Sequence, residues 1–304
     1  MPKVDLSLII LSYNTKDLLR KCLESVARCR KEKNSPVIQT IVVDNASFDD
    51  SPKMVKEKFP WVELVCSKKN LGFAAGNNLG LRRAKGDFIL FLNSDTELLP
   101  NALKETIEFM KSDKMIGAMS PKTLLFSGGM DPDCHRGFPT PWASLTYFFG
   151  LEKLFPKSKI FGQYHKFYED LSKPHEIDAG AGAFMVIRKE IIKKVGKWDE
   201  NYFFYGEDLD YFYRIKQGGW KVMFYPKVLV KHHKGASSGL RSESRKISFA
   251  SKETRLKAAQ SSIKAMEIFY QKFYKNKYPK WMTTAVIWGI KVKGFFRILF
   301  HKLK

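Results

Sequence analysis

The segment Asn93-Ser94-Asp95 directly follows Phe88–Leu92, an apolar run with the character of a buried strand. A carboxylate at the end of a buried strand is costly to desolvate unless a cation lies against it. In open α/β sheets, ligands bind just outside the carboxyl ends of the strands. Asp95 is therefore a candidate ligand for a divalent metal that would in turn hold a phosphate group. The alternative is an ordinary turn, because Asn, Ser and Asp all favour turns.

Polar residues also follow the three preceding strand-like runs. These residues are Ser12-Tyr13-Asn14, Asp44-Asn45-Ala46-Ser47 and the segment from Asn70 to Asn78. Tyr13 can stack on a nucleobase, and Asp44 can accept the imide N–H of uracil or thymine. Gly72 and Gly76 would let the backbone approach a sugar or phosphate closely. Four such strand ends on one rim predict a nucleotide site. No G-x-G-x-x-G follows the first strand, which argues against a nicotinamide dehydrogenase.

A second acidic group, Gly206-Glu207-Asp208-Leu209-Asp210, lies within an aromatic stretch. Acidic residues in the first turn of a helix interact favourably with its dipole, and this explains at least one of them. The functional interpretation is a general base, whose pKa an apolar environment would raise. Asp208 is the first candidate and Glu207 the second, whereas Asp210 is expected to be structural or to position an acceptor.

Alternating strand and helix patterns over the first 120 residues predict a doubly wound α/β domain. The expected strands are 4–12, 37–44, 61–67, 87–93 and 116–120, and the expected helices are 15–30, 49–58, 74–84 and 101–112. Residues 124–175 resemble an insertion of loops and short helices. Further on we expect a strand at 183–188, a helix at 207–217, a strand pair broken at Pro226 within 220–232, and helices at 249–275 and 281–300.

Composition narrows the class of protein. The 304 residues carry a net charge of +22, and the four cysteines show no C-x-x-C spacing, which fits a reducing cytosol better than a disulfide scaffold. No signal peptide is visible at the start, and no apolar run is long enough to span a bilayer. A nucleic-acid binder would fit the charge alone, but no recognition-helix or RNP-type motif accompanies it, so we expect no nucleic-acid partner.

Five ordered motifs resemble those of family 2 glycosyltransferases of the GT-A (nucleotide-diphospho-sugar transferase) fold. The likeness is greatest to the rhamnosyltransferase-like members that build bacterial cell-envelope polysaccharide, and it covers residues 4–237. The motifs are Leu8 to Asn14, Val42 to Ser47, Asn70 to Asn78, Leu92 to Asp95 and Gly206 to Asp210. The resemblance implies a mostly parallel central sheet in a catalytic domain at 1–240, with a donor half at 1–120 and an acceptor half at 121–240. A basic, amphipathic helical extension would occupy 241–304.

The resemblance also assigns roles to residues. The donor nucleotide-sugar would contact Ser12, Tyr13, Asn14, Asp44, Asn70, Gly72, Gly76, Asn77, Asn93, Ser94 and Asp95. Asn93-Ser94-Asp95 takes the place of the D-x-D metal motif, so Asp95 is its main carboxylate ligand for Mn²⁺ or Mg²⁺. His232 would complete the metal site, with His233 as the alternative. Asp208 or Glu207 would be the base.

The expected function is that of an inverting glycosyltransferase. It would move a sugar, with rhamnose favoured, from a dTDP- or UDP-sugar to a glycan or a lipid-diphosphate-linked acceptor. The alternative is a non-catalytic sugar-nucleotide-binding subunit of a polysaccharide assembly system.

The end of the chain is strongly basic. Between Thr254 and Lys304, 12 Lys or Arg residues face one Glu, which gives 12 − 1 = +11. Aromatic and basic residues alternate in Trp281–Phe300, a pattern typical of a helix at a membrane interface. We therefore expect a cytoplasmic protein bound peripherally to the inner face of the cytoplasmic membrane. The alternative is a helix packed on the catalytic domain with a solvated basic face.

Overall fold

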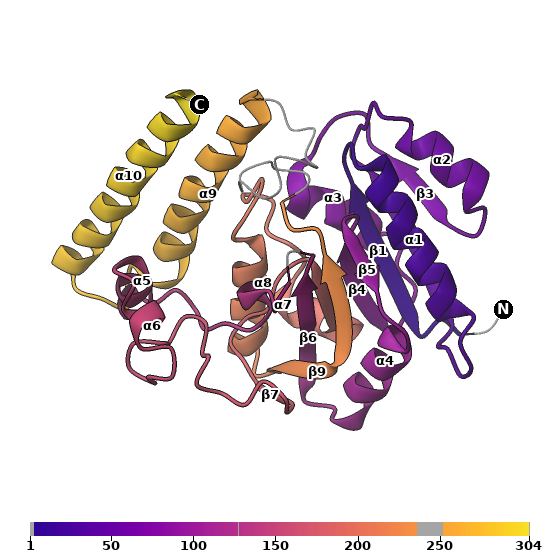
Figure 1. Cartoon of the computed structure of the whole chain (residues 1–304), viewed down its shortest axis with the longest axis horizontal. Helices are drawn as coiled ribbons and strands as arrows, with labels where there is room; N and C mark the ends of the chain where they lie inside the picture. The colour runs from indigo at the N-terminus through magenta and orange to yellow at the C-terminus, as the bar shows by residue number, and fades with distance from the viewer. Residues whose placement is uncertain (1–2, 127, 236–251, 304) are drawn as a thin grey trace.

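The computed structural model describes residues 3–126, 128–235 and 252–303, and its centre is one mixed β-sheet (Figure 1). The strands are β1 Leu6–Ser12, β2 Ile38–Asp44, β3 Glu63–Cys66, β4 Phe88–Asn93, β5 Thr96–Leu98, β6 Ile116–Leu125, β7 His175–Glu176, β8 Phe184–Arg188 and β9 Lys221–His232. The order is β3-β2-β1-β4-β8-β6-β9-β5, and β7 also pairs with β9. Strands β1, β2, β3, β4, β6 and β9 run in one direction, and β5, β7 and β8 run against them. The predicted mostly parallel sheet is confirmed.

Helices cover both faces of the sheet, as the doubly wound pattern predicts. They are α1 Lys16–Arg30, α2 Ser51–Lys58, α3 Gly72–Leu81, α4 Ala102–Ser112, α5 Pro141–Phe148, α6 Leu151–Leu154, α7 Ile192–Val195, α8 Glu207–Gln217, α9 Lys252–Phe273 and α10 Lys280–Leu303, with short 3₁₀ turns at Pro132–Cys134 and Lys189–Ile191. Alternation along β1 separates two cores: Leu8 faces α1, α2 and α4, whereas Ile9 faces α3 and α8. The strands are apolar on both faces because helices cover both.

Four details of the strand prediction were wrong. β5 and β7 were missed, because their three and two residues are too few for a periodic pattern to appear. β6 continues to Leu125, five residues beyond the predicted end at Ser120. The segment around Pro226 is one continuous strand, β9, with a register shift opposite Pro121 and Lys122 that accommodates the proline.

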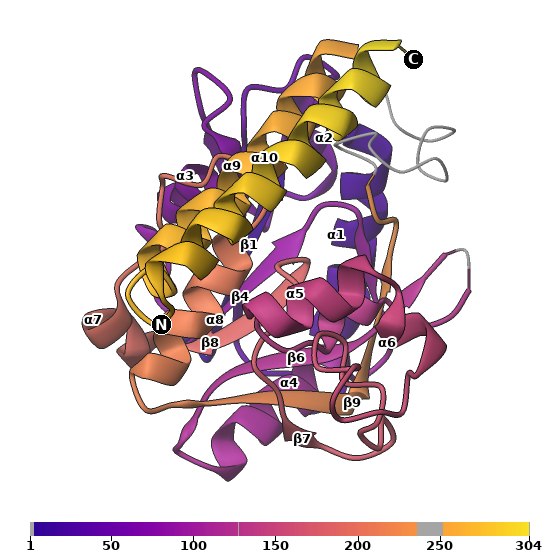
Figure 2. The ribbon, with the colours of Figure 1, turned by 90° about the vertical axis from the view of Figure 1, so that its left-hand side faces the viewer.

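The C-terminal extension is helical, as predicted, and forms an antiparallel pair. Arg297 reaches Ser262 and Tyr270 reaches Thr283, so α10 runs back along α9. Figures 1 and 2 show the pair as an outer layer beside α8. The predicted boundary at 240/241 and the predicted helix residues 249–251 lie outside the described residues, so the division into two domains stays a prediction.

Helix α9 is attached to α8 and to the loop that precedes it through charged groups. Lys272 Nζ lies 2.6 Å from Asp199 Oδ2 and 2.6 Å from Asp210 Oδ2. Asp210 is fully buried and also pairs with Arg214 at 2.6 Å. The third carboxylate of the acidic motif is therefore structural, and it connects α8 to α9.

This contact predicts a loss of stability. Lys272→Met removes one of two cations that neutralise the buried Asp210, so the free energy of unfolding should fall by about 1–3 kcal/mol. Urea unfolding measures the change. Lys264→Met, at an exposed position on the same helix, is the matched control and should change stability by less than about 0.5 kcal/mol. Equal effects of the two substitutions would contradict the assigned contact.

Candidate active site

The polar strand ends meet at one edge of the sheet. In the strand register Ser12 pairs with Asp44, and Leu11 pairs with Asn93. His232, the last residue of β9, pairs with Thr96 immediately after the Asn93-Ser94-Asp95 segment. The carboxyl ends of β1, β2, β4 and β9 therefore bring together side chains that lie up to 220 positions apart in the sequence.

Hydroxyl groups join the ends of β1 and β4. Ser12 Oγ lies 3.1 Å from Thr15 Oγ1, which lies 2.8 Å from Ser94 Oγ. All three side chains are buried, whereas Tyr13 beside them is partly exposed. Thr15 was missed as a site residue because it is the first residue of the expected helix 15–30. Ser12 and Ser94 hold the rim together, and their contact with a donor stays a prediction.

Asn14 supports the loop that follows β2. Its backbone has a positive φ of 53°, its N–H donates to Ser47 Oγ at 2.9 Å, and its Oδ1 accepts the Phe48 N–H at 2.9 Å. These bonds hold the loops after β1 and β2 together. The predicted role of Asn14 in binding a nucleotide would therefore operate through the shape of this loop.

Asp44 has the features expected of a ligand-binding carboxylate. The residue is only 3% exposed, and its Oδ2 accepts the Ser47 N–H at 3.0 Å. Its Oδ1 is buried and has no hydrogen-bond partner within the described part of the chain. A buried acceptor without a donor costs free energy. An N–H from a bound base would satisfy it.

The glycines of α3 have packing roles. Gly72 has φ +79°, and a Cβ there would lie 2.5 Å from the Phe203 carbonyl oxygen. A Cβ at Gly76 would lie 2.5 Å from Leu11 Cδ1. Both positions need glycine because the backbone approaches protein atoms closely. Their predicted approach to a donor sugar is untested.

Asparagine side chains hold the same segment in place. Asn70 Oδ1 accepts the Gly72 N–H at 2.9 Å, and Asn45 reaches Asn70 Oδ1 at 3.0 Å. Asn77 Nδ2 donates to the Phe73 carbonyl one turn earlier, at 3.1 Å, so this side chain is directed along its own helix. Asn93, at the end of β4, donates its backbone N–H to the Ala183 carbonyl at 3.0 Å. These contacts position the rim, and donor binding by Asn70, Asn77 and Asn93 stays a prediction.

Asp95 and His232 form the candidate metal site. Asp95 Oδ1 lies 3.3 Å from His232 Nε2, and both side chains are buried. His232 Nδ1 faces Asp131 Oδ2 at 3.6 Å, an arrangement typical of a metal-binding histidine oriented by a second carboxylate. No cluster of three or more His, Cys, Asp or Glu side chains suited to a metal occurs among the residues that the structure describes. The donor set therefore fits an ion that takes its remaining ligands from a bound diphosphate.

The register of β9 distinguishes the two histidines. His232, the last residue of β9, and Lys234, in the turn that follows, both face Asp131. His233 points the other way, where it stacks on Phe126 and lies 3.4 Å from Glu97 Oε1. Of the two candidates, only His232 lies beside the Asp95 carboxylate.

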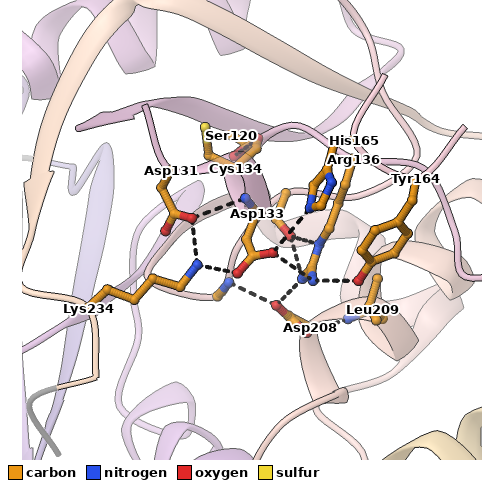
Figure 3. Close-up of polar contacts among 12 residues, drawn as sticks. Ser120, Asp131, Asp133, Cys134, Arg136, Tyr164, His165, Asp208, Leu209 and Lys234 are labelled. Atoms are coloured by element: carbon orange, nitrogen blue, oxygen red, sulfur yellow. Dashed lines mark hydrogen bonds and ion pairs between the residues drawn. The ribbon is translucent and has the colours of Figure 1, made fainter. Parts of the chain in front are cut away.

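Figure 3 shows that the candidate base is connected to a set of buried charges. Lys234 Nζ pairs with Asp131 Oδ1 at 2.5 Å and also with Asp133 Oδ2. Asp133 Oδ1 lies 3.8 Å from Arg136, whose Nη2 donates to Asp208 Oδ2 at 2.6 Å. We call the sequence Asp95, His232, Asp131, Lys234, Asp133, Arg136 and Asp208 the charge chain. It runs from the candidate metal ligands to the candidate base.

The charges along the charge chain alternate in sign, and this alternation shifts the pKa values of Asp131 and His232. Burial alone would raise the pKa of Asp131, but His232 and Lys234 hold the pKa well below its usual range. Burial alone would lower the pKa of His232, but Asp95 and Asp131 raise it to about 9. Each buried charge is thus stabilised by opposite charges on its neighbours.

Asp208 is held in a defined orientation. Its Oδ2 accepts from Arg136 and from the Gly182 N–H at 3.2 Å, and its Oδ1 accepts the Leu209 N–H at 2.8 Å. Because a carboxylate oxygen can accept two hydrogen bonds, Oδ1 retains room for an incoming hydroxyl. The Asp208 side chain is 15% exposed, whereas Glu207 is 6% exposed as a residue. Access therefore favours Asp208 over Glu207 as the base.

Glu207 has the perturbed pKa that the aromatic setting predicts. Burial, and next the negative charge of Asp208, raise the pKa of Glu207 to about 8. Its Oε2 has no hydrogen-bond partner within the described part of the chain. The sequence argument from apolar surroundings thus applies to Glu207, while the accessible carboxylate is that of its neighbour.

Most of the site residues that were not predicted from the sequence lie in residues 124–175, the segment of loops and short helices. Asp131, Asp133 and Arg136 follow no strand or helix pattern, so nothing local indicated that they face the site. Asp131-Pro132-Asp133 does have D-x-D spacing, a signal that could have drawn attention to it. Lys234 pairs with both of these carboxylates.

Comparison with known proteins gives the family and the fold. The model described as Glycosyl transferase family 2 matches residues 7–196. The N-acetylglucosaminyl-diphospho-decaprenol L-rhamnosyltransferase of Mycobacterium tuberculosis is 23% identical over 247 residues, which cover 77% of this chain and 78% of that protein.

The solved structures that resemble this one include two with bound Mn²⁺. The mannosyltransferase PcManGT from Pyrobaculum calidifontis, in complex with GDP-Man and Mn²⁺, has a TM-score of 0.59 and 16% identity, covering 100% of this chain and 74% of its own. GalNAc-T7 with UDP, GalNAc and Mn²⁺ has a TM-score of 0.58 and 17% identity, covering 87% of this chain and 48% of its own. These likenesses confirm the predicted GT-A fold.

The pKa of Glu207 predicts a pH-dependent stability. The folded protein keeps the carboxyl protonated up to about pH 8, whereas the unfolded chain ionises it above the ordinary value of 4.5. Stability contributed by this group is therefore present below pH 4.5 and is lost as the pH rises to about 8. Glu207→Gln should raise the melting temperature relative to the wild type much more at pH 8.5 than at pH 5.

Calorimetry at the two pH values measures this difference. Glu57→Gln, at an exposed position of α2, is the control. Its melting temperature should differ from that of the wild type by the same amount at both pH values. The same shift for Glu207→Gln at pH 5 and pH 8.5 would show that the buried carboxyl does not titrate abnormally.

Proposed function

This chain belongs to glycosyl transferase family 2, and we propose that it is an inverting glycosyltransferase of bacterial cell-envelope polysaccharide synthesis. The observation that carries the proposal is the orientation of Asp208. Arg136 and Gly182 fix one of its carboxylate oxygens, and the other can still accept a hydrogen bond from the hydroxyl of a sugar acceptor. Such a carboxylate, at the edge of the sheet where ligands bind, is suited to general-base chemistry.

The nucleoside diphosphate of the donor would bind along the rim from β1 to β4. The unpaired Oδ1 of Asp44 would accept the imide N–H of uracil or thymine, which would discriminate against bases without that group. Asp95 and His232 would hold Mn²⁺ or Mg²⁺, for which His232 would have to give up the ring proton that its raised pKa retains. The ion would neutralise charge on the diphosphate. The Mn²⁺ in the two similar structures supports a divalent cofactor.

Asp208 would take the proton from the acceptor hydroxyl as that oxygen attacks the anomeric carbon. Attack occurs on the face opposite the departing diphosphate, so the configuration at that carbon inverts. Arg136 would keep the carboxylate in the orientation that the attack requires.

The donor and acceptor are proposed by analogy with the mycobacterial relative, whose name specifies rhamnose transfer to a diphospho-decaprenol-linked sugar. We propose dTDP-rhamnose as the first donor to test, UDP-sugars as the alternative, and a lipid-diphosphate-linked glycan as the acceptor. The protein would then act at the inner face of the cytoplasmic membrane. Within the described residues, no helix combines the length and the apolarity needed to cross a bilayer.

Donor binding predicts a thermal shift. With Mn²⁺ present, dTDP-rhamnose at about 100 times its dissociation constant should stabilise the protein by about 2.7 kcal/mol, a rise of a few degrees in melting temperature. Asp44→Asn presents an N–H₂ where the base needs an acceptor and should abolish the shift. A UDP-sugar that acts in place of dTDP-rhamnose would correct the donor. No shift with any nucleotide sugar would contradict the proposal.

Catalysis predicts a separate result. Asp208→Asn should lower kcat at least about 100-fold while leaving the donor-induced thermal shift intact. Arg136→Lys keeps the positive charge but loses the planar fork, and should lower kcat about 10–100-fold through misplacement of Asp208. Asp50→Asn, whose side chain is 73% exposed, is the control. Donor binding with full retention of turnover in Asp208→Asn would exclude Asp208 as the base, and donor binding without any turnover in the wild type would indicate a non-catalytic subunit.

A further inference from the structure

Exposed apolar side chains are concentrated in two segments. Of the seventeen large hydrophobic residues that are exposed in the described part of the chain, thirteen lie in residues 141–160 or on α10. A monomeric protein rarely exposes so many neighbouring apolar groups without a partner. The two segments are 120 positions apart in the sequence, and both lie on the side of the molecule that faces the viewer in Figure 2.

Helix α10 presents its aromatic residues outward. Trp281, Trp288 and Phe295, seven positions apart, are 70%, 69% and 64% exposed. Two of its basic residues lie toward α9: Arg297 donates to Ser262 Oγ of α9 at 3.0 Å, and burial together with Arg297 lowers the pKa of Lys293. The helix does pack on the rest of the protein through α9. Its exposed face carries these aromatic residues together with Lys280 and Lys291, a combination that favours a membrane surface over solvent alone.

The segment from α5 to Ile160 has the same character. Phe148, Phe149, Leu154, Phe155 and Ile160 are each between 52% and 70% exposed. This segment meets α10 directly, because Lys293 Nζ lies 5.5 Å from the centre of the Phe148 ring. The two segments thus form a continuous surface, which we call the aromatic surface.

The charge of the aromatic surface is almost entirely positive. Residues 141–160 contain Lys153, Lys157 and Lys159, all exposed, and α10 contains five further Lys or Arg residues. The one acidic residue in both segments, Glu152, is buried and pairs with His165 at 3.1 Å. Aromatic side chains with lysines and no exposed carboxylate match the headgroup region of an anionic bilayer.

We propose that the aromatic surface, formed jointly by residues 141–160 and α10, binds the surface of an anionic lipid bilayer. This extends the membrane partner of the proposed function from one helix to two segments, and it rests on that function only for the lipid-linked acceptor. The aromatic side chains enter the interface and the lysines contact lipid phosphates. The catalytic half of the chain is attached to this surface through α9.

Vesicle flotation tests the proposal without any need for transferase activity. The wild type should float with vesicles of phosphatidylglycerol and phosphatidylcholine, and binding to phosphatidylcholine alone should be at least about tenfold weaker. Trp288→Ser/Phe295→Ser on α10 and Phe149→Ser/Phe155→Ser in the other segment should each weaken binding about tenfold or more. Met115→Ser, an exposed residue outside both segments, is the control.

Folding and self-association are measured in parallel. Because the substituted side chains are exposed, all variants should keep the melting temperature and the donor-induced thermal shift of the wild type. Absence of binding by the wild type would overturn the proposal, as would loss of binding in the α10 variant alone. Light scattering that shows a wild-type dimer, with both variants monomeric, would reassign the surface to contact between two copies of the chain.

Discussion

The ion pair between Arg136 and Asp208 is the interaction on which the rest of the site depends. It connects α8 to a segment with no regular structure, and it ends a chain of alternating charges that begins at Asp95. Each member lies beside a group of opposite charge, and such pairing is what makes the burial of charge tolerable. The site is therefore held as one electrostatic unit, and a change at either end alters the environment of the other.

The fold could be predicted from the sequence because its signals are local. Buried parallel strands are continuous apolar runs, and each one ends in polar residues that mark the same edge. The positions of Asp44 and Asp95 followed from this logic, whereas Asp208 was indicated by a group of acidic residues at the start of a helix pattern. The short β5 and the continuous β9 did not, because pairing with a distant strand, and not the local pattern, determines them.

The partners of these residues could not be predicted in the same way. Arg136 is 72 positions from Asp208, and Lys234 is about 100 positions from Asp131 and Asp133. No periodicity specifies such pairs. Gly72 and Gly76 of α3 show the reverse case. The sequence showed that glycine is needed at these positions, but the atoms that require it belong to Phe203 and Leu11, which only the fold brings close. Local sequence thus indicates where chemistry occurs better than it indicates how the groups are held.

Helix α10 packs on α9, and α9 packs on the segment that carries Asp208. These two layers set the distance between the outer face of α10 and the candidate base. Packed helices lie roughly 10 Å apart axis to axis. With the outer face of α10 on a bilayer, α8 lies two such layers away, roughly 20 Å from the lipid headgroups. The two helical layers would then fix the distance between the membrane and the candidate base. An acceptor anchored in the membrane would have to extend by that distance before its terminal hydroxyl reached the base.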